Sequence, residues 1–394
     1  MKSFQTPMEG GMKSFQTPME GKMKSFQTPM EGEMKSFQTP MEGGMKSFQT
    51  PMKGGMKGLW GAVLVVGFVV AAVYSDAAQS AEAAKKVVMR IGGDIATCNC
   101  DWEAPHTQAI EKIAKPRLKE LTKGEVELQY FPATSGMGQK QLYEQMLLGA
   151  WEGVAITTAV LETYVPSIQI VSMPYIWSSF NHIHRVLDGP LGKKLEQDAL
   201  KKGFRILGWW HFPPRDILCR GVETVKVPGD LKGKKIRSMQ SPVYVRTLQA
   251  YGATPVPMEW LEVYMGMKQG VVDCQETSIL PAYYMKHYEV TKTVVQLEQI
   301  YTMLVFAVSE RWWSKLSRTH QDAIAKAVAE ATGFQRQKDE ELYQLMIELW
   351  KKAGVQFIRP EREPFIQAAR ATYPQYYDIV GKENIDFILK QAQK

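Results

Sequence analysis

The chain has 394 residues, of which 45% are hydrophobic and 23% are charged. This length suits two domains of ordinary size, and the composition is that of a folded globular protein. The formal net charge of +7 is mild, and no block of Lys and Arg is interleaved with aromatic residues. Nucleic acid is therefore not an expected partner.

Residues 1–55 are five near-identical copies of an 11-residue unit, which reads MKSFQTPMEGG in the first copy. Every copy carries Pro and Gly, and its only large apolar side chains are Phe and Met. The copies therefore contain no stripe of apolar residues that could build a core. We expect a disordered tandem repeat that lies upstream of the natural start at Met56.

Residues 56–83 have the parts of a secretory signal peptide in the right order. Lys57 is the charged start, an apolar run covers 59–74, and residues 81–83 (AEA) form a small-x-small cleavage site. The apolar run is shorter than the roughly 20 residues of a membrane span, although a retained N-terminal anchor is the alternative. We predict a protein exported to the periplasm whose mature form begins near Ala84.

Four cysteines follow the signal segment: Cys98, Cys100, Cys219 and Cys274. In an oxidising compartment they predict one or two disulfides, and the sequence leaves the pairing open. Cys98-Asn-Cys100 resembles half of a metal site, but no second Cys/His pair at ligand spacing accompanies it. No metal and no other cofactor is therefore predicted.

The first half of the mature chain alternates between strand and helix patterns. Strands are predicted over 87–93, 125–132 and 153–159, helices over 109–124 and 141–150, and an apolar segment over 168–177. Alternation of this kind is typical of βαβ units around a mostly parallel sheet.

The same alternation returns after Gly203. Strands are predicted over 204–212, 234–239, 254–258 and 271–277, helices over 242–253 and 262–270, and a long amphipathic helix over 321–354. We therefore predict a hinged α/β protein with helices on both faces of mostly parallel sheets. Its parts are lobe I (about 84–205), lobe II (about 206–300) and C-terminal helices (about 301–394) that pack across both lobes.

Motifs of enzyme active sites are missing at the strand-to-helix turns, where no GxSxG, HExxH, Walker or GxGxxG pattern stands. The six histidines are scattered, and His182 and His184 are predicted to point to different faces of a helix. Asp273 and Glu276 could form an acid/base pair, although strand-end residues of this kind more often bond to neighbouring backbone. An exported enzyme that uses this pair is one alternative function.

Arg237 is the strongest candidate for ligand binding. It lies near the end of a predicted strand, and Ser241-Pro242 just after it is a helix-start signal. Ligands of open α/β sheets bind beyond the carboxyl ends of the strands, where a guanidinium and a helix N-terminus both favour an anion. Because a guanidinium holds a carboxylate through two parallel bonds, we predict carboxylate binding. An interdomain salt bridge is the alternative role.

The stretch LKGKKIRSMQSPVYVRTLQAYGATPVPMEWLEVYMGMKQGVVDCQET (231–277) resembles a segment shared by the solute-binding subunits of TRAP transporters, the DctP-type proteins. FPATSGMGQKQLYEQMLLGAWEG (131–153), VSMPYIW (171–177) and RVLDGPLGKKL (185–195) extend the resemblance over nearly all of 87–378. It implies a two-lobed periplasmic protein that is not an enzyme, binds a small organic acid and delivers it to two integral membrane subunits. C4-dicarboxylates, keto acids and aromatic acids remain open as ligands, and a ligand-sensing protein of the same fold is the second alternative.

The resemblance also implies which residues bind the ligand. Arg237 matches the arginine of the family's KIR motif, the main carboxylate clamp, and Arg215 is the best match to a second, upstream arginine. The other matches are Trp260 as the aromatic that packs on the ligand, Thr277 as the residue that closes the QEN-type motif, and Asp94, Gln139 and Thr157 as cleft-facing positions of the first lobe.

Three departures from the family pattern bear on the ligand. Cys274 stands where the pattern GVVDGQE has glycine, and Thr277 stands where the family has Asn. In members that bind sialic acid, an acidic residue stands at the position of Thr157, so sialic acid is not an expected ligand. These departures leave the arginine clamp intact and the far end of the ligand undefined.

Overall fold

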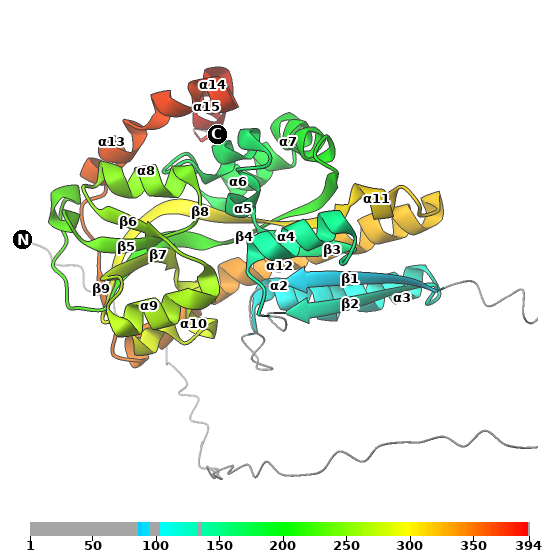
Figure 1. Cartoon of the computed structure of the whole chain (residues 1–394), viewed down its shortest axis with the longest axis horizontal. Coiled ribbons are helices and arrows are strands. Elements are labelled where there is room, and N and C mark those ends of the chain that lie inside the picture. Colours follow the sequence, from blue (N-terminus) through cyan, green and yellow to red (C-terminus); the bar gives the residue numbers. More distant parts are fainter. Residues whose placement is uncertain (1–85, 94–102, 133–135, 393–394) are drawn as a thin grey trace, which may run out of the picture. The chain divides into compact units, whose positions relative to one another are not determined.

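The computed structural model describes residues 86–93, 103–132 and 136–392, all of which belong to one compact unit (Figure 1). The repeats, the signal segment, Asp94, Cys98 and Cys100 lie outside the described residues. Within those residues, no helix is both long and apolar enough to cross a membrane.

The strands join into a single nine-stranded sheet with the order β2-β1-β3-β8-β4-β7-β5-β6, in which β9 also pairs with β8. Their bounds are Val87–Gly93 (β1), Val126–Pro132 (β2), Gly153–Thr157 (β3), Phe204–Cys219 (β4), Lys235–Ser238 (β5), Thr254–Pro257 (β6), Cys274–Ser278 (β7), Thr293–Ser309 (β8) and Gln356–Ile358 (β9). Strands β1–β3 form the sheet of the first lobe, and β5–β7 form that of the second.

The two longest strands, β4 and β8, connect the lobes. They pair antiparallel along most of their length, from Phe204 opposite Ser309 to Cys219 opposite Thr293. The end of β8 pairs with β3 of the first lobe, whereas the end of β4 pairs with β7 of the second. Figure 1 shows this pair of strands between the two groups of parallel strands.

The helices cover the sheet and connect its strands. In the first half they are α2 (Pro105–Gln108), a π-helical turn (Ala109–Ala114), α3 (Lys115–Leu121), α4 (Gln139–Leu148), α5 (Thr158–Leu161), α6 (Phe180–Leu187) and α7 (Pro190–Leu200). In the second half they are α8 (Pro242–Ala250), α9 (Val263–Gln269), α10 (Ile279–Tyr284), α11 (Glu310–Trp313), α12 (Arg318–Lys352), α13 (Glu363–Arg370), α14 (Tyr377–Val380) and α15 (Lys382–Gln391). Short 3-10 turns cover Pro166–Ser172, Pro228–Leu231, Trp260–Glu262, His287–Glu289 and Tyr373–Tyr376.

Local sequence explains why α8 begins and ends where it does. The hydroxyl of Ser241 accepts a hydrogen bond from the backbone N–H of Val243, and Pro242 occupies the first helical position. Just beyond the helix, Gly252 has a φ of 79°, which a residue without a Cβ adopts at little cost. The strand–helix boundary after Arg237 is thus set by these residues, as predicted.

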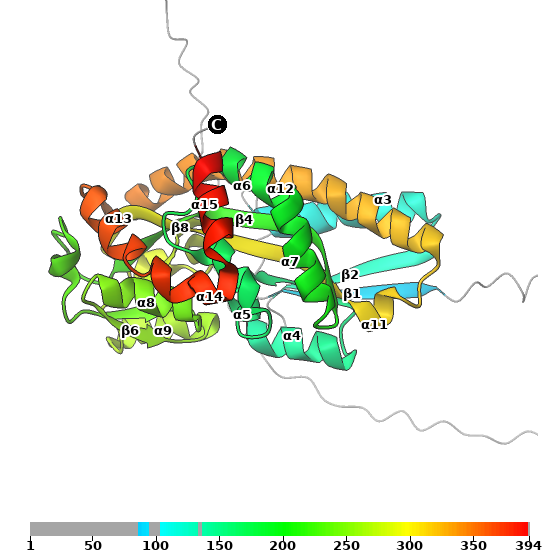
Figure 2. The same cartoon turned by 90° about the horizontal axis from the view of Figure 1, so that it is seen from above.

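Helix α12 contacts both lobes (Figure 2). It packs against α2, α3 and the π-helical turn of the first lobe, and against β4 and α10 further along. Trp210 of β4 donates from Nε1 to the hydroxyl of Thr332 at 2.8 Å, and Trp350 donates to the carbonyl of Ile279 at 3.0 Å. The buried face of α12 completes the largest hydrophobic cluster, which includes Trp210 and Phe306.

Most predicted elements are present, and the main error concerns β8. Residues 301–309, which we expected at the start of the C-terminal helices, belong to this strand. The pairs β3–β8, β8–β4 and β4–β7 are antiparallel, whereas the other five strand pairs are parallel. The apolar segment over 168–177 begins as a 3-10 turn, and strand β4 continues beyond the predicted end to Cys219.

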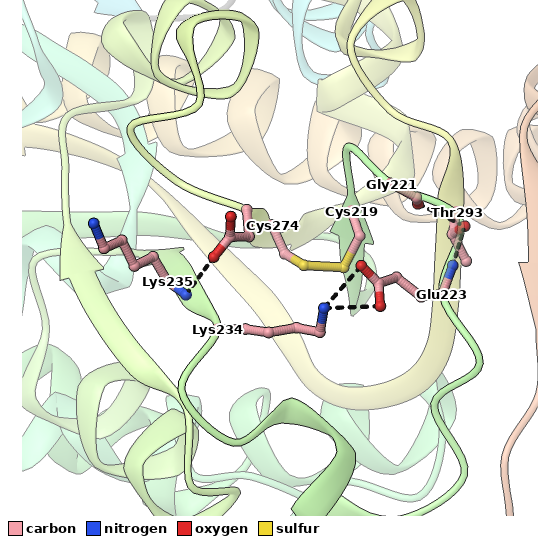
Figure 3. Close-up of a disulfide and its surroundings, with 8 residues drawn as sticks. Cys219, Gly221, Glu223, Lys234, Lys235, Cys274 and Thr293 are labelled. Carbon is pink, nitrogen blue, oxygen red and sulfur yellow. Dashed lines mark hydrogen bonds and ion pairs between the residues drawn. A yellow bond between two sulfur atoms is a disulfide. The ribbon is translucent and has the colours of Figure 1, made fainter.

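A disulfide joins Cys219 to Cys274 at adjacent ends of β4 and β7 (Figure 3). The two residues lie directly opposite each other in the antiparallel pair, and both are fully buried. Close by, Lys234 pairs with Glu223, and the hydroxyl of Thr293 donates to the carbonyl of Gly221. The described residues contain no free cysteine.

Candidate functional site

A pocket lies at the carboxyl ends of β3, β5 and β7, between residues of the two lobes. We call it the arginine pocket; its walls are Gln139, Thr157, Phe212, Arg215, Arg237, Met239, Trp260, Thr277, Pro281 and Thr302. It holds about 330 Å³ of empty space, part of it open to solvent. An adjoining pocket of about 530 Å³ shares Gln139, Arg237, Met239 and Trp260 with it.

The walls of the arginine pocket include six of the seven residues that the sequence assigned to ligand binding. The first lobe contributes Gln139 and Thr157, and the rest of the chain contributes Arg215, Arg237, Trp260 and Thr277. The seventh residue, Asp94, lies outside the described residues. The structure thus brings together side chains that lie up to 138 positions apart in the sequence, from Gln139 to Thr277. That these side chains contact a ligand stays a prediction.

Arg237 extends from β5 into the wall shared by both pockets, and only 2% of its surface is exposed. Its Nε and Nη2 donate to the carbonyl oxygen of Met258 at 3.1 and 2.8 Å. The guanidinium lies over the indole ring of Trp260, 5.6 Å from the centroid, at cation–π distance. These contacts fix the plane of the guanidinium in the pocket wall.

Arg215 is the better anchored of the two arginines. Its Nε and Nη2 donate to the two carboxylate oxygens of Glu276 at 2.5 and 2.8 Å, and both side chains are buried. Nη1 donates to the hydroxyl of Thr302 at 3.1 Å, and the guanidinium packs over Tyr244. Because the carboxylate of Glu276 already accepts two hydrogen bonds from the guanidinium of Arg215, the positive charge of Arg215 is neutralised within the pocket wall.

The candidate acid/base pair, Asp273 and Glu276, has separate partners. Glu276 is held by Arg215, as described, and neither residue lines the two pockets. Asp273 precedes β7, next to the disulfide-bonded Cys274, and accepts a hydrogen bond from the backbone N–H of Lys235 at 2.9 Å. This bond to neighbouring backbone is the simpler of the two roles considered from the sequence.

Gln139 and Thr157 fix each other in the first lobe. The side-chain oxygen of Gln139, at the start of α4, accepts from both the backbone N–H and the hydroxyl of Thr157, at 2.9 and 2.6 Å. A Cβ at Gly138, just before α4, would lie 2.7 Å from a carboxylate oxygen of Glu259. A larger residue at this position would therefore displace the end of that flexible side chain.

The rings of Trp260 and His287 lie next to each other near Arg237, with their centroids 4.8 Å apart. The indole Nε1 of Trp260 is buried and has no hydrogen-bond partner among the described residues. His287 contacts the side-chain oxygen of Gln275 through Nδ1 at 2.9 Å. Burial, together with the charge of Arg237, lowers the pKa of His287 to about 3, so this imidazole is neutral beside the guanidinium.

The N-terminus of α8 does not face the pocket as an open anion site, contrary to our expectation. The hydroxyl of Ser241 donates a hydrogen bond to the carboxyl of Glu162, which follows α5 and is fully buried. Burial raises the pKa of Glu162 to about 8, although the hydroxyls of Ser172 and Ser241 lower it in part. The protein's own carboxyl group therefore occupies this helix end.

Sequence reasoning missed several residues of the pocket wall, namely Phe212, Met239, Pro281 and Thr302. Thr302 belongs to β8, the strand that was not predicted, so no pattern could place it at the site. Phe212, by contrast, lies at the end of the predicted strand 204–212, inside β4, and period-two spacing could have assigned it to one face.

Comparison with known proteins identifies the family. The family model described as bacterial extracellular solute-binding protein, family 7 (DctP), matches residues 101–379. The chain belongs to this family. As a member it is an extracytoplasmic solute-binding protein, and the resemblance read from the sequence is correct.

Two solved structures and one further relative resemble the chain closely. The 2,3-diketo-L-gulonate-binding periplasmic protein YiaO of Escherichia coli (strain K12) is 31% identical over 253 residues, which cover 64% of this chain and 76% of the relative. A TRAP periplasmic solute-binding protein of Citrobacter koseri with bound D-glucuronate has a TM-score of 0.71 and 27% identity, covering 76% of this chain and 98% of its own. The sugar acid binding protein DctPAm of Advenella mimigardefordensis in complex with galactonate has a TM-score of 0.74 and 25% identity, covering 78% and 98%.

Proposed function

We propose that this protein captures a sugar acid, a small hydroxylated monocarboxylic acid, as the periplasmic subunit of a TRAP transporter. The arrangement of the arginine pocket is the observation that carries this proposal. A guanidinium from β5 lies in a wall that also presents hydroxyl groups from β3, β7 and β8 and an amide group from α4. The class of ligand is narrower than the C4-dicarboxylates, keto acids and aromatic acids that the sequence left open.

The charges in the pocket favour one carboxylate group over two. A dicarboxylate is best held by two guanidinium groups, each of which offers a two-bond edge. Here the carboxylate of Glu276 already neutralises Arg215, whereas Nε and Nη2 of Arg237 donate to the neutral carbonyl oxygen of Met258. Arg237 is therefore the residue that we assign to the carboxylate of the ligand, and Arg215 keeps Glu276 and Thr302 in place.

The other groups of the pocket suit a chain of hydroxyl groups. Thr157, Thr277, Thr302 and Gln139 bring neutral donors and acceptors to the wall. Trp260 and Phe212 offer aromatic faces on which the C–H groups of a sugar acid can pack. The sugar acids bound in the Citrobacter koseri and Advenella mimigardefordensis relatives are ligands of this chemistry.

A thermal-shift screen on the mature protein tests the class of ligand. D-galacturonate, D-glucuronate and galactonate should raise Tm by several degrees, because a ligand at 100 times its Kd adds about 2.7 kcal/mol to stability. D-galactose and D-glucose are matched controls that lack the carboxylate, and they should have no effect. A response to succinate or malate alone, or to the neutral sugars, contradicts the proposal.

Ligand binding is proposed to close the lobes about β4, β8 and α12, the elements that both lobes share. The wall residues come from both lobes, so closure brings all of them onto the ligand. Small-angle scattering with and without a saturating ligand should show a smaller radius of gyration for the complex. An unchanged radius with a tightly bound acid counts against closure.

We also propose that the protein delivers the acid to the membrane subunits and does not alter it chemically. The acid recovered from the complex should be chemically unchanged, which NMR of the released ligand checks against the enzyme alternative. Co-expression with the two integral membrane subunits of a TRAP transporter should give uptake that depends on this protein. Binding without any such dependence would favour the ligand-sensing alternative.

A further inference from the structure

Three side chains that the proposed function does not use converge outside the arginine pocket. They are His184 from α6, His211 from β4 and Glu340 from α12, and their ligand atoms all lie within 4.8 Å of one another. The Nε2 atoms of the two histidines are 3.0 Å apart. We call this group the His–His–Glu cluster. Its members are separated widely in sequence, so no spacing motif marks them.

None of the three residues lines the arginine pocket or the adjoining pocket. His211 instead meets α12: its backbone N–H donates to the side chain of Gln335 at 3.3 Å, and Gln335 donates back to its carbonyl at 2.6 Å. The two sites are therefore separate.

His211 is held in one orientation. Its Nδ1 lies 3.0 Å from a carboxylate oxygen of Asp339, which is fully buried, and the ring of Phe180 stacks on it at 4.2 Å. A carboxylate on one nitrogen fixes the imidazole tautomer and leaves the lone pair on the other. Nε2 of His211 faces Nε2 of His184, so His211 and Asp339 have the geometry of a carboxylate–histidine–metal triad when Nδ1 of His211 carries the proton.

We propose that the His–His–Glu cluster binds a divalent transition-metal ion, with Zn²⁺ the best fit, through Nε2 of both histidines and a carboxylate oxygen of Glu340. Two imidazoles and one carboxylate form a three-ligand zinc set that leaves a fourth position for water. Zinc–nitrogen bonds of about 2.05 Å at a tetrahedral angle separate the nitrogens by roughly 3.3 Å, close to the separation here. The borderline N/O donor set disfavours Mg²⁺ and Ca²⁺, which take oxygen ligands.

A single hydrogen bond between the histidines is the simpler explanation of their contact, but it leaves the other features without a role. It does not account for the third ligand group of Glu340 at the same point, next to Asp339 on α12. His184 is half-buried and Glu340 is exposed, which gives an ion a way in from solvent. The nearby charge of Arg336 is countered, since its Nη1 and Nη2 pair with Asp188 at 2.7 and 2.8 Å.

Titration of the chelator-treated mature protein with Zn²⁺ tests this proposal. Wild-type protein should bind one equivalent, and His184→Ala and Glu340→Gln should weaken binding by about a hundredfold and tenfold. Both residues are accessible, so neither change should unfold the protein, which circular dichroism checks. Glu341→Gln and His320→Ala are matched controls on the surface of α12, and they should bind zinc as wild type does.

Two further measurements exclude other ligands and a merely structural effect. Co²⁺ in the site should give the intense visible absorption of a tetrahedral complex, and His184→Ala should abolish it. Asp339→Asn should weaken zinc binding by about 10- to 100-fold, because it disturbs the orientation of His211. Zinc binding that keeps its wild-type affinity in His184→Ala and Glu340→Gln, that disappears when cysteines are alkylated, or that is absent from folded wild-type protein overturns the proposal.

Discussion

The hydroxyl of Ser241 donates a hydrogen bond to the buried carboxyl group of Glu162. This bond joins the first turn of α8 in the second lobe to the end of α5 in the first. Residues next to both partners, Val160, Thr163 and Gln240, line the adjoining pocket, so the bond lies beside the proposed ligand site. A buried carboxyl group therefore takes part in the contact between the lobes.

We predict that stability falls as pH rises through the range set by Glu162. Burial raises the pKa of this carboxyl from 4.5 to about 8, so below pH 4.5 both the folded and the unfolded protein hold the proton. Above it the unfolded chain loses the proton first, and the stabilisation is lost as pH rises to about 8. Urea unfolding at pH 5, 7 and 8.5 should show this loss in wild type.

Glu162→Gln is the matched control, because the amide cannot ionise at the same position. Its free energy of unfolding should fall less between pH 5 and 8.5 than that of wild type, by an amount on the order of a few kcal/mol at about 1.4 kcal/mol per pKa unit. Burial also raises the pKa of Asp216 to about 8, but that carboxyl is common to both proteins and cancels in the difference. Equal slopes in the two proteins would contradict the prediction.

Arg237 should be required for binding in a way that lysine does not rescue. A two-bond pair gives two charge-assisted hydrogen bonds of roughly 1.5–3 kcal/mol each, so Arg237→Ala should weaken binding by about 3 kcal/mol or more. That loss is on the order of a hundredfold in Kd. Arg237→Lys keeps the charge but loses the planar fork, and most of the deficit should remain in calorimetric titration.

The same two variants decide between a ligand clamp and an interdomain salt bridge. Both lose the bonds to the carbonyl of Met258, so a small fall in the Tm of the ligand-free protein is expected. A structural salt bridge predicts a large fall in Tm together with near-normal affinity in the protein that still folds. That combination would remove the assignment of Arg237 to the carboxylate.

Removal of the disulfide should lower stability without changing affinity. The disulfide links residues 55 positions apart, which restricts the conformations of the unfolded chain. Losing this restriction lowers the free energy of unfolding by about 4 kcal/mol in the chain-entropy model. Cys219→Ala/Cys274→Ala should therefore unfold at a clearly lower urea concentration. Its Kd for the acid should stay within about twofold, because neither cysteine lines the pockets.

The mature protein should begin near Ala84 when the chain is exported. The order of charged start, apolar run and small-x-small site over 56–83 directs cleavage to this point. N-terminal sequencing of periplasmic protein checks the position, and a chain that starts at Met56 should be exported equally well. Copies of MKSFQTP in the mature form would overturn this reading.

Much of the fold could be predicted because local patterns agree with it. Arg237, Ser241 and Pro242 combine a buried strand, an N-cap and the first helical position within six residues, so the strand–turn–helix there follows from sequence alone. Strand β8 was not predicted, for the opposite reason. Its residues are buried along almost the whole strand, which removes the alternation that separates a strand from a buried helix.

The features of the candidate site also divide into those that local sequence predicts and those that it does not. The residues carried by motifs, such as Arg237 and Trp260, lie in the pocket wall, and their contact with a ligand stays a prediction. The pairing of Arg215 with Glu276 was not foreseen, because it joins two strands that are adjacent in space but 61 residues apart in sequence. The approach of His184 to His211 is equally invisible in the sequence, since it depends on how α6 packs over β4.

Helix α12 is one unbroken 35-residue helix with contacts in both lobes, and this continuity gives the protein an elastic element. A rotation of one lobe relative to the other must bend the helix instead of turning a loose joint, so the bending energy rises with the angle. Gly333, near its middle, has no described atom within 4 Å of where a Cβ would stand, so packing does not demand glycine there. Because glycine is a weak helix former, bending of α12 at this point costs less than it would at alanine.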